Sequence, residues 1–146
     1  MARKWLILAA VSLILCAATV IGVRVQSVKA SSPPPIQLSS IGVLGSDYSA
    51  HASYHRGAQI ELWVDYYNSS GYEYWVTLHP AVYHSSYRLA NFSTQILTQP
   101  YVGFQDSDWW ITIPKNAPLG TYKYWFTLSE SGYPDQTLVI SFKVVK

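Results

Sequence analysis

Few side chains in this sequence have the types and spacing that metal binding requires. His51 and His55 are four residues apart, a spacing that would place both on one face of a helix. Their Ser-, Gly- and Tyr-rich surroundings have no helical periodicity and offer no third ligand nearby. Asp106 and Asp108 supply only two of the several oxygen ligands that a calcium loop needs. We therefore expect no metal and no cofactor, and we interpret both histidines as solvated loop residues.

The sequence also contains no recognisable motif of catalytic residues. None of the many serines lies in a Gly-x-Ser-x-Gly turn, which would expose a nucleophile between a strand and a helix. No Ser/His/Asp triad can be assembled from the spacing. The carboxylates lie at predicted turns or on outward strand faces: Glu61, Asp65, Glu73, Asp106 and Asp108. We expect no catalytic residues and predict that the protein is not an enzyme.

An uncharged apolar run from Trp5 to Val23 opens the chain, with Arg3 and Lys4 before it and Arg24 after it. The run is longer than a typical signal h-region of about 7–15 residues and close to the roughly 20 residues of a spanning helix. Two alternatives stay open: a signal peptide removed after Ala30, or a retained anchor. Both predict an extracellular or cell-surface protein, which contacts the membrane through residues 5–23 if they are retained.

This layout divides the chain into a signal peptide or membrane anchor at 1–30, a Pro-rich linker at 31–35 and one domain at 36–146. Residues 31–146 contain six Lys or Arg and eight Asp or Glu, which gives a net charge of −2. Because they form no basic patch, we exclude nucleic acid as a partner. The single cysteine, Cys16, lies in the apolar run. The domain therefore has no disulfide and depends on its core.

Alternation of apolar and polar residues with a period of two indicates β-strands in the domain. It is clearest at 60–66, 72–78, 121–128 and 137–145; shorter strands are predicted at 36–43, 93–97 and 109–113, and an edge strand at 82–89. The turn residues 68–71 predict a short hairpin between the first two clear strands. No stretch has helical periodicity. The pattern predicts an all-β fold, a seven-stranded antiparallel sandwich.

Residues 113–122, Ile-Pro-Lys-Asn-Ala-Pro-Leu-Gly-Thr-Tyr, resemble the penultimate-strand signature of prokaryotic immunoglobulin-like domains. Residues 67–71, Tyr-Asn-Ser-Ser-Gly, resemble a hairpin of the adhesion-related, CARDB-like members. The resemblance covers roughly residues 36–146 and implies an immunoglobulin-like sandwich of a cell-surface protein. It places Tyr122 at the tyrosine-corner position and Tyr124 where antibody domains have a cysteine. It implies architecture more strongly than function.

Twelve Tyr and six Trp exceed what a core of this size needs, so we expect aromatic contact surfaces. In immunoglobulin strand order, the alternation turns Trp75 and Trp125 outward on neighbouring strands of one sheet. Likewise it turns Trp63 and Trp110 outward on the other sheet. Three interpretations stay open for these tryptophans: packing over the flat sheets, contact with proteins, and stacking on sugar rings, for which no cluster of carboxylates or amides is evident in the sequence.

We therefore predict a non-enzymatic exported protein, a structural subunit of a filament or surface layer that assembles through its aromatic sheet faces. The alternative is a monomeric recognition module that binds carbohydrate or a protein partner. Residues 31–45 could be a strand of their own domain or a strand donated to a neighbour. Asn68 and Asn91 fit the N-glycosylation pattern, and we expect Asn68 to be accessible in its hairpin.

Overall fold

Strands account for all of the regular structure in the part of the chain that the computed structural model describes, residues 32–146. In chain order they are β1 (Ile36–Gly45), β2 (Ser53–His55), β3 (Gln59–Asn68), β4 (Trp75–His84), β5 (Tyr87–Asn91), β6 (Thr94–Leu97), β7 (Gly103–Thr112), β8 (Gly120–Glu130) and β9 (Gln136–Val145). The predicted all-β class is confirmed. The described residues form nine strands rather than seven, because short strands flank the longer ones.

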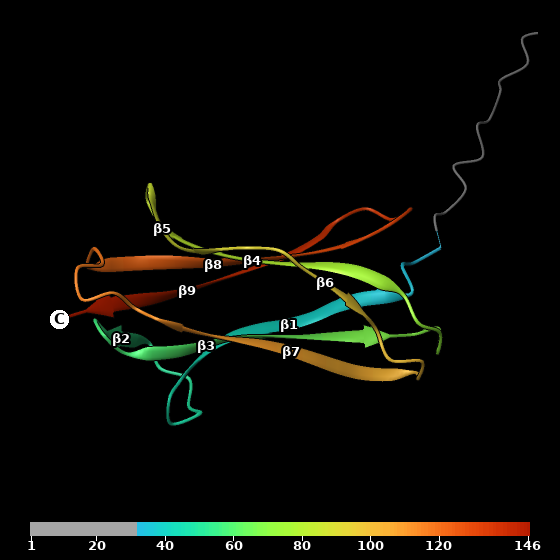
Figure 1. The fold of residues 1–146 in the computed structure, drawn as a ribbon, viewed down its shortest axis with the longest axis horizontal. Coiled ribbons are helices and arrows are strands. Elements are labelled where there is room, and N and C mark those ends of the chain that lie inside the picture. The colour runs from blue at the N-terminus through green and yellow to red at the C-terminus, as the bar shows by residue number, and fades with distance from the viewer. Residues whose placement is uncertain (1–31) are drawn as a thin grey trace, which may run out of the picture. The chain divides into compact units, whose positions relative to one another are not determined.

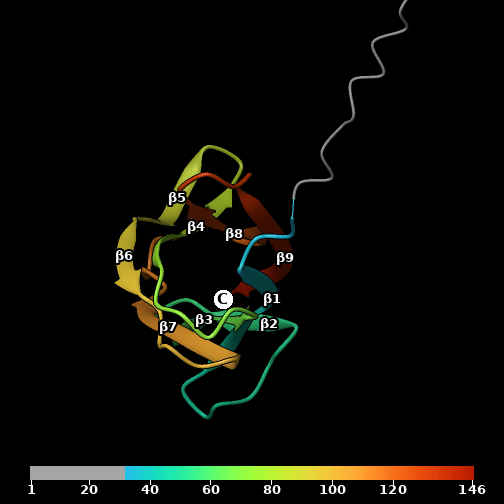
Figure 2. The same ribbon diagram turned by 90° about the vertical axis from the view of Figure 1, so that its right-hand side faces the viewer.

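Two sheets pack face to face, as the end-on view in Figure 2 shows. One sheet, here called sheet A, has the order β1-β3-β7. The other, sheet B, has the order β2-β9-β8-β4-β5, and β6 also pairs with β4. All pairs are antiparallel except β2 with β9, which is parallel. Strand β1 pairs with β3 of its own chain along its whole length (Figure 1), as expected if residues 36–45 are a strand of their own domain.

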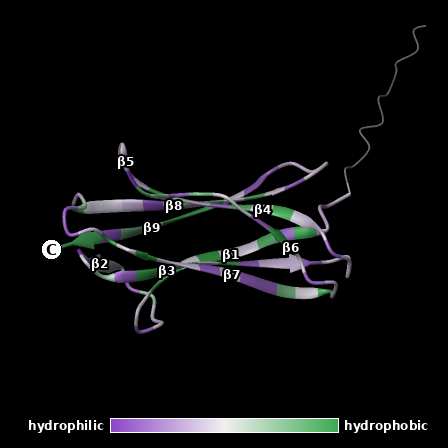
Figure 3. Ribbon diagram, viewed as in Figure 1, coloured by the Kyte–Doolittle hydropathy of each residue, from purple (hydrophilic) through white to green (hydrophobic). Residues whose placement is uncertain are grey.

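The core forms between the sheets from the buried apolar residues of the alternating strands. Hydrophobic and hydrophilic segments both occur along the long strands of the two sheets (Figure 3). Its largest fully buried side chains include Tyr122, Tyr124 and Phe126, with Leu62 and Val76 from the neighbouring strands. These residues lie in the segments 60–66, 72–78 and 121–128, for which alternation predicted strands. Ile111 and Ile140 occupy inward positions as well, opposite Ile60 and Tyr124, but are only partly buried. Ile111 lies on β7, which is an edge strand of sheet A, and β9 pairs with β8 on one side but with only the three residues of β2 on the other.

Side-chain hydrogen bonds tie the two sheets together at one end. Gln136, the first residue of β9, donates from Nε2 to the carbonyl of Ile36 (2.7 Å) and accepts from the amide of Leu38 (2.9 Å). A different hydrogen bond fixes the turn before β8. The Tyr122 hydroxyl donates to the carbonyl of Pro118 at 2.8 Å. This contact spans the turn that leads into β8, as a tyrosine corner does.

Residues 69–74 do not form the predicted hairpin. Strands β3 and β4 belong to different sheets, so this loop crosses from one sheet to the other, and β4 begins only at Trp75. The predicted edge strand at 82–89 is also wrong, because β4 continues to His84 and β5 begins at Tyr87. A residue with positive φ, Ser85, turns the chain between them.

The predicted signal or anchor segment lies outside the described residues. Within residues 32–146 no helix is long and apolar enough to span a membrane.

Candidate functional site

The outer face of sheet A is acidic. Strands β1, β3 and β7 contain no Lys or Arg, whereas four carboxylates occupy outward positions: Glu61, Asp65, Asp106 and Asp108. Across β3 and β7, Asp65 is opposite Asp106, Trp63 is opposite Asp108, and Glu61 is opposite Trp110. A tryptophan therefore stands between two carboxylates on the outward face of β3, whereas on β7 two consecutive outward carboxylates precede the tryptophan. Asp106 and Asp108 belong to the middle of β7, not to a turn before the strand as the sequence had indicated.

These carboxylates repel one another, and strands β1, β3 and β7 provide no cation to compensate them. Burial raises the pKa of Glu61, and the negative charges of Asp108 and Asp106 raise it further. One oxygen of Glu61 is buried and accepts no hydrogen bond. Asp65 accepts a hydrogen bond from the Ser40 hydroxyl at 3.1 Å, which is a neutral donor. The face therefore carries a negative charge that the described residues do not neutralise.

The two tryptophans of sheet A have different roles. The Trp63 ring lies over Gly42 on β1, so closely that a β-carbon at Gly42 would overlap it. Trp63 is half-buried, and its indole N–H is buried without an acceptor. Trp110 is 37% exposed and meets Tyr48 edge-on at a centroid distance of 5.6 Å. Trp63 thus mainly covers the sheet, and Trp110 is the accessible member of the predicted pair.

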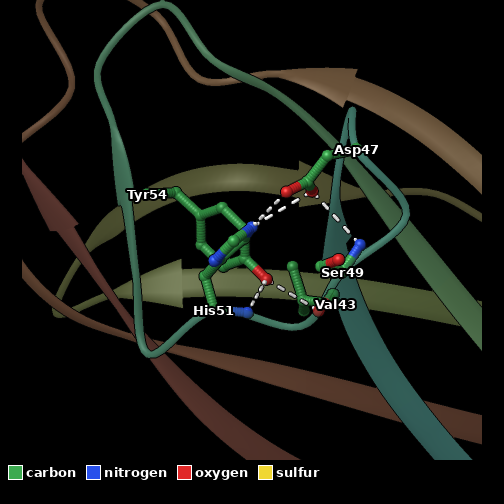
Figure 4. A network of polar contacts seen from close by, with 5 residues as sticks. All are labelled: Val43, Asp47, Ser49, His51 and Tyr54. Atoms are coloured by element: carbon green, nitrogen blue, oxygen red, sulfur yellow. Dashed lines mark hydrogen bonds and ion pairs between the residues drawn. The ribbon is translucent and has the colours of Figure 1, made fainter.

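The loop that carries Tyr48 is held by the polar network in Figure 4. Asp47 accepts hydrogen bonds from the His51 ring at 3.0 Å and from the Ser49 amide at 3.1 Å. The first of these contacts lowers the pKa of the Asp47 carboxyl most. The Tyr54 hydroxyl donates to the carbonyl of Val43 at 2.7 Å. His51 thus orders this loop beside sheet A.

The depression of about 420 Å³ beside this loop is lined by Asp47, His51 and His55 among others. His51 and His55 are both exposed, as expected, but only His51 lies in a loop, since His55 is the last residue of β2. Within residues 32–146 no group of three or more His, Cys, Asp or Glu side chains is placed to hold a metal ion.

The outer face of sheet B is basic. Its exposed cations are Lys123 on β8, Lys143 on β9 and Arg88 on β5, which is opposite Tyr83 of β4. The six strands of this sheet contain one carboxylate, Glu130, and that side chain points inward and is buried. No described residue on the outer face therefore offsets the positive charge.

Trp125 lies in the middle of the basic face and is 42% exposed. It is flanked by Ala81 of β4 on one side and by the exposed Val139 of β9 on the other. The Lys123 ammonium lies 6.0 Å from the centre of the Trp125 ring, within the range of a cation–π contact. The centre of this face thus combines an apolar surface with positive charge.

Trp75 and Trp125 do not form the predicted pair. Ala81, not Trp75, is opposite Trp125, and the offset of six positions from Trp75 to Ala81 corresponds to roughly 20 Å along the strand. Trp75, 66% exposed, instead pairs across to Leu97 at the end of the sandwich. Further exposed apolar side chains lie in the loop before β4, in the loop between β6 and β7 and at the start of β7: Tyr72, Tyr101, Val102 and Phe104.

The two glycosylation candidates differ in accessibility. Asn68 is fully buried: its amide N–H groups donate to the carbonyls of Tyr72 (2.8 Å) and Gln99 (3.0 Å), and its oxygen accepts from Ser70 and Gly71. The expectation that Asn68 is accessible is wrong, because its side chain closes the loop between the sheets. Asn91 is exposed and contacts the His79 ring at 2.7 Å. Modification of Asn91 stays a prediction.

Sequence reasoning missed Tyr48 and the opposite charges of the two faces. Tyr48 lies in a loop without strand periodicity, so nothing in the sequence places it beside Trp110. The separation of charge between the two faces could have been predicted from the sequence. Once β3 and β7 are assigned to one sheet and β8 and β9 to the other, the outward positions of the first pair are acidic and those of the second are basic.

Comparison with known proteins supports the fold alone. No family model matches the sequence, and no curated protein matches it significantly. The structure is similar to the C-terminal domain of Wzt, with a TM-score of 0.58, 11% identity, and coverage of 77% of this chain and 74% of that one. It is also similar to a Bacteroides uniformis β-glucuronidase, with a TM-score of 0.54 and 12% identity. That match covers 75% of this chain but only 14% of the enzyme.

The Bacillus subtilis sporulation control protein Spo0M is a third similar structure, with a TM-score of 0.50 and 11% identity. The match covers 76% of this chain and 49% of Spo0M, so this chain aligns with about half of that protein. At such low identity these similarities show a shared β-sandwich architecture.

Proposed function

We propose that this protein is a non-enzymatic, exported structural subunit of a filament or surface layer and that it assembles through the outer faces of its two sheets. The observation that carries the proposal is that each outer face has an accessible tryptophan, Trp110 on sheet A and Trp125 on sheet B. Tryptophan is enriched at the energetic centres of protein interfaces. A subunit in a continuous array needs two adhesive surfaces, and a lone recognition module needs only one.

The proposal includes a more specific fold type than the β-sandwich architecture alone. We infer an immunoglobulin-like sandwich of the prokaryotic, CARDB-like type. The parallel pairing of β2 with β9 and the Tyr122 hydrogen bond to Pro118 support an immunoglobulin-like arrangement. Export rests on the apolar run at 5–23 and the Pro-rich linker at 31–35. N-terminal sequencing tests this: a start at Ser31 indicates a cleaved signal, and a start at Met1 or Ala2 in the membrane fraction indicates an anchor.

Alanine substitutions test assembly. Trp110→Ala and Trp125→Ala should each weaken self-association by about 2 kcal/mol or more, the range for an interface hot spot. Trp75→Ala is the matched control, because it removes a more exposed tryptophan from the end of the sandwich rather than from a face. Sedimentation velocity reports association, and urea unfolding reports stability. Weaker association from Trp75→Ala alone would place the interface at the end and contradict the proposal.

One observation favours the alternative of carbohydrate recognition. Sugar sites combine an aromatic plane with hydrogen-bonding groups, and on sheet A Trp110 lies on the same strand face as Asp108 and across from Glu61. The structure thus provides the carboxylates that the sequence alone did not bring together. In this alternative Trp110→Ala abolishes binding to immobilised cell-surface glycan, and self-association is the same in the wild type and the variant.

A further inference from the structure

The charges of this domain are segregated by sheet. The outer face of sheet A holds four carboxylates and no cation, and the outer face of sheet B holds Arg88, Lys123 and Lys143 and no exposed carboxylate. Within residues 32–146 the only contact between groups of opposite charge joins His51 and Asp47, in the loop beside sheet A. Among the described residues, the cations of one face and the carboxylates of the other therefore have no partner of opposite charge.

We propose that the acidic outer face of sheet A docks onto the basic outer face of sheet B of a second copy of this chain. The inference rests on the proposed function and specifies which face meets which. Docking places Asp106 and Asp108 near Lys123 and Arg88, and it brings Trp110 and Trp125 into one apolar centre. Opposite potentials on two surfaces select the correct partner and accelerate encounter.

Pairing of identical faces is disfavoured by the same charges. Two copies of sheet A would bring eight carboxylates together, in a region where burial and the charges of Asp108 and Asp106 already raise the pKa of Glu61. Two copies of sheet B would oppose Lys123 and Arg88 to their equivalents. Like charges across an interface are strongly unfavourable. Unlike faces remain, and a contact between unlike faces leaves one free face at each end, so that copies can continue to add.

The area of the two faces limits how much surface the contact can bury. Three strands about 4.8 Å apart and ten residues long at about 3.3 Å per residue form a face on the order of 500 Å². Two such faces bury on the order of 1,000 Å², near the lower limit for a specific interface. We therefore expect a weak contact for a pair of chains, with a clear salt dependence because exposed charges contribute to it.

Charge reversal of one face at a time tests the inference. The basic-face variant carries Arg88→Glu and Lys123→Glu, and the acidic-face variant carries Asp106→Lys and Asp108→Lys. Each variant, purified as the full chain in nonionic detergent, should associate at least tenfold more weakly than the wild type in low salt. An equimolar mixture should recover association, because the intact acidic face of the first variant meets the intact basic face of the second.

Lys115→Glu is a control for charge reversal away from both faces, because it makes one such reversal in the exposed loop between β7 and β8; it should leave association unchanged. Urea unfolding of each variant confirms that it folds, and Arg88→Gln with Lys123→Gln replaces the basic-face variant if charge reversal prevents folding. The glutamine variant should weaken association in the same direction.

Wild-type association in both charge variants, or an equimolar mixture that does not recover, would overturn the inference. The proposed function survives that result if Trp110→Ala and Trp125→Ala still weaken association as predicted, since the faces then meet in another arrangement. A wild-type chain that stays monomeric at every concentration overturns both.

Discussion

Replacing Phe126 with alanine should remove a large part of the stability of the sandwich. Phe126 is fully buried in the middle of β8, with Trp109 at a ring-centroid distance of 6.0 Å and Tyr124 at 6.4 Å. Burying a phenylalanine is worth about 1.5–3 kcal/mol. The cavity left behind adds to this, for a total of about 3–5 kcal/mol. A domain of this size has about 5–15 kcal/mol in all.

The neighbouring residue provides the matched control. Trp125 precedes Phe126 on the same strand but points outward and is 42% exposed. Trp125→Ala should therefore cost the isolated domain less than about 1 kcal/mol, as substitutions away from the core usually do. The difference in unfolding free energy between the two variants tests whether Phe126 points inward and Trp125 outward. Because both variants truncate a large aromatic residue of the same strand, a general sensitivity of the domain to truncation would affect both.

Urea unfolding at low protein concentration, followed by tryptophan fluorescence and circular dichroism, gives both values from the midpoint and slope of each transition. The low concentration keeps self-association out of the stability measurement. A loss below about 1 kcal/mol for Phe126→Ala, or equal losses at the two positions, would refute the orientation of β8 on which both outer faces depend.

Three further changes test other parts of the account. Tyr122→Phe removes the 2.8 Å hydrogen bond to Pro118 and should cost about 0.5–1.5 kcal/mol in urea unfolding. Burial raises the pKa of Glu130, so its folded state binds more protons than its unfolded state between the two pKa values. Stability should therefore fall as pH rises from about 4.5 through the raised pKa, and Glu130→Gln should reduce that fall and give a higher melting temperature at pH 7. Gly42→Ala should push the Trp63 ring off the sheet and shift its fluorescence to longer wavelength, whereas an unchanged spectrum would mean that the ring does not lie there.

The inward face of each long strand could be predicted from the sequence because period-two alternation is a local property. Residues 121–128 illustrate this: Tyr122, Tyr124, Phe126 and Leu128 are apolar, alternate with more polar residues, and are all fully buried. Sheet membership was also predicted, since β3 pairs with β7 and β4 pairs with β8, as in the immunoglobulin strand order. Predicting the inward face requires only the residue pattern within a strand, and predicting sheet membership requires only the order in which the strands pair.

Positions along neighbouring strands could not be predicted, because they depend on where two distant segments begin to pair. Trp75 and Trp125 were assigned to one face, yet the pairing of β4 with β8 places them roughly 20 Å apart. The same reason explains the error at Asn68. The sequence Asn-Ser-Ser-Gly is typical of an exposed turn, but here the Asn68 amide binds carbonyls at Tyr72 and Gln99, and the second of these is distant in sequence.

The accessible part of the candidate site was only partly predicted. Trp125 was identified because it alternates with core residues on a strand of clear period, and Trp110 because it lies at an outward position of the shorter strand predicted at 109–113. The packing of Trp63 over Gly42 depends on the register between β1 and β3, which includes an irregularity between Leu38 and Ser40. Nothing in the local sequence reports such a shift.

Sedimentation velocity of the wild-type full chain over a wide concentration range, at low and high salt, tests the central claim most directly. Assembly through two unlike faces predicts an open series of species whose mean size keeps increasing with concentration, and the series should shift toward monomer as salt is added. A single monomeric species at all concentrations would contradict assembly. A series that stops at a dimer would contradict assembly through two faces.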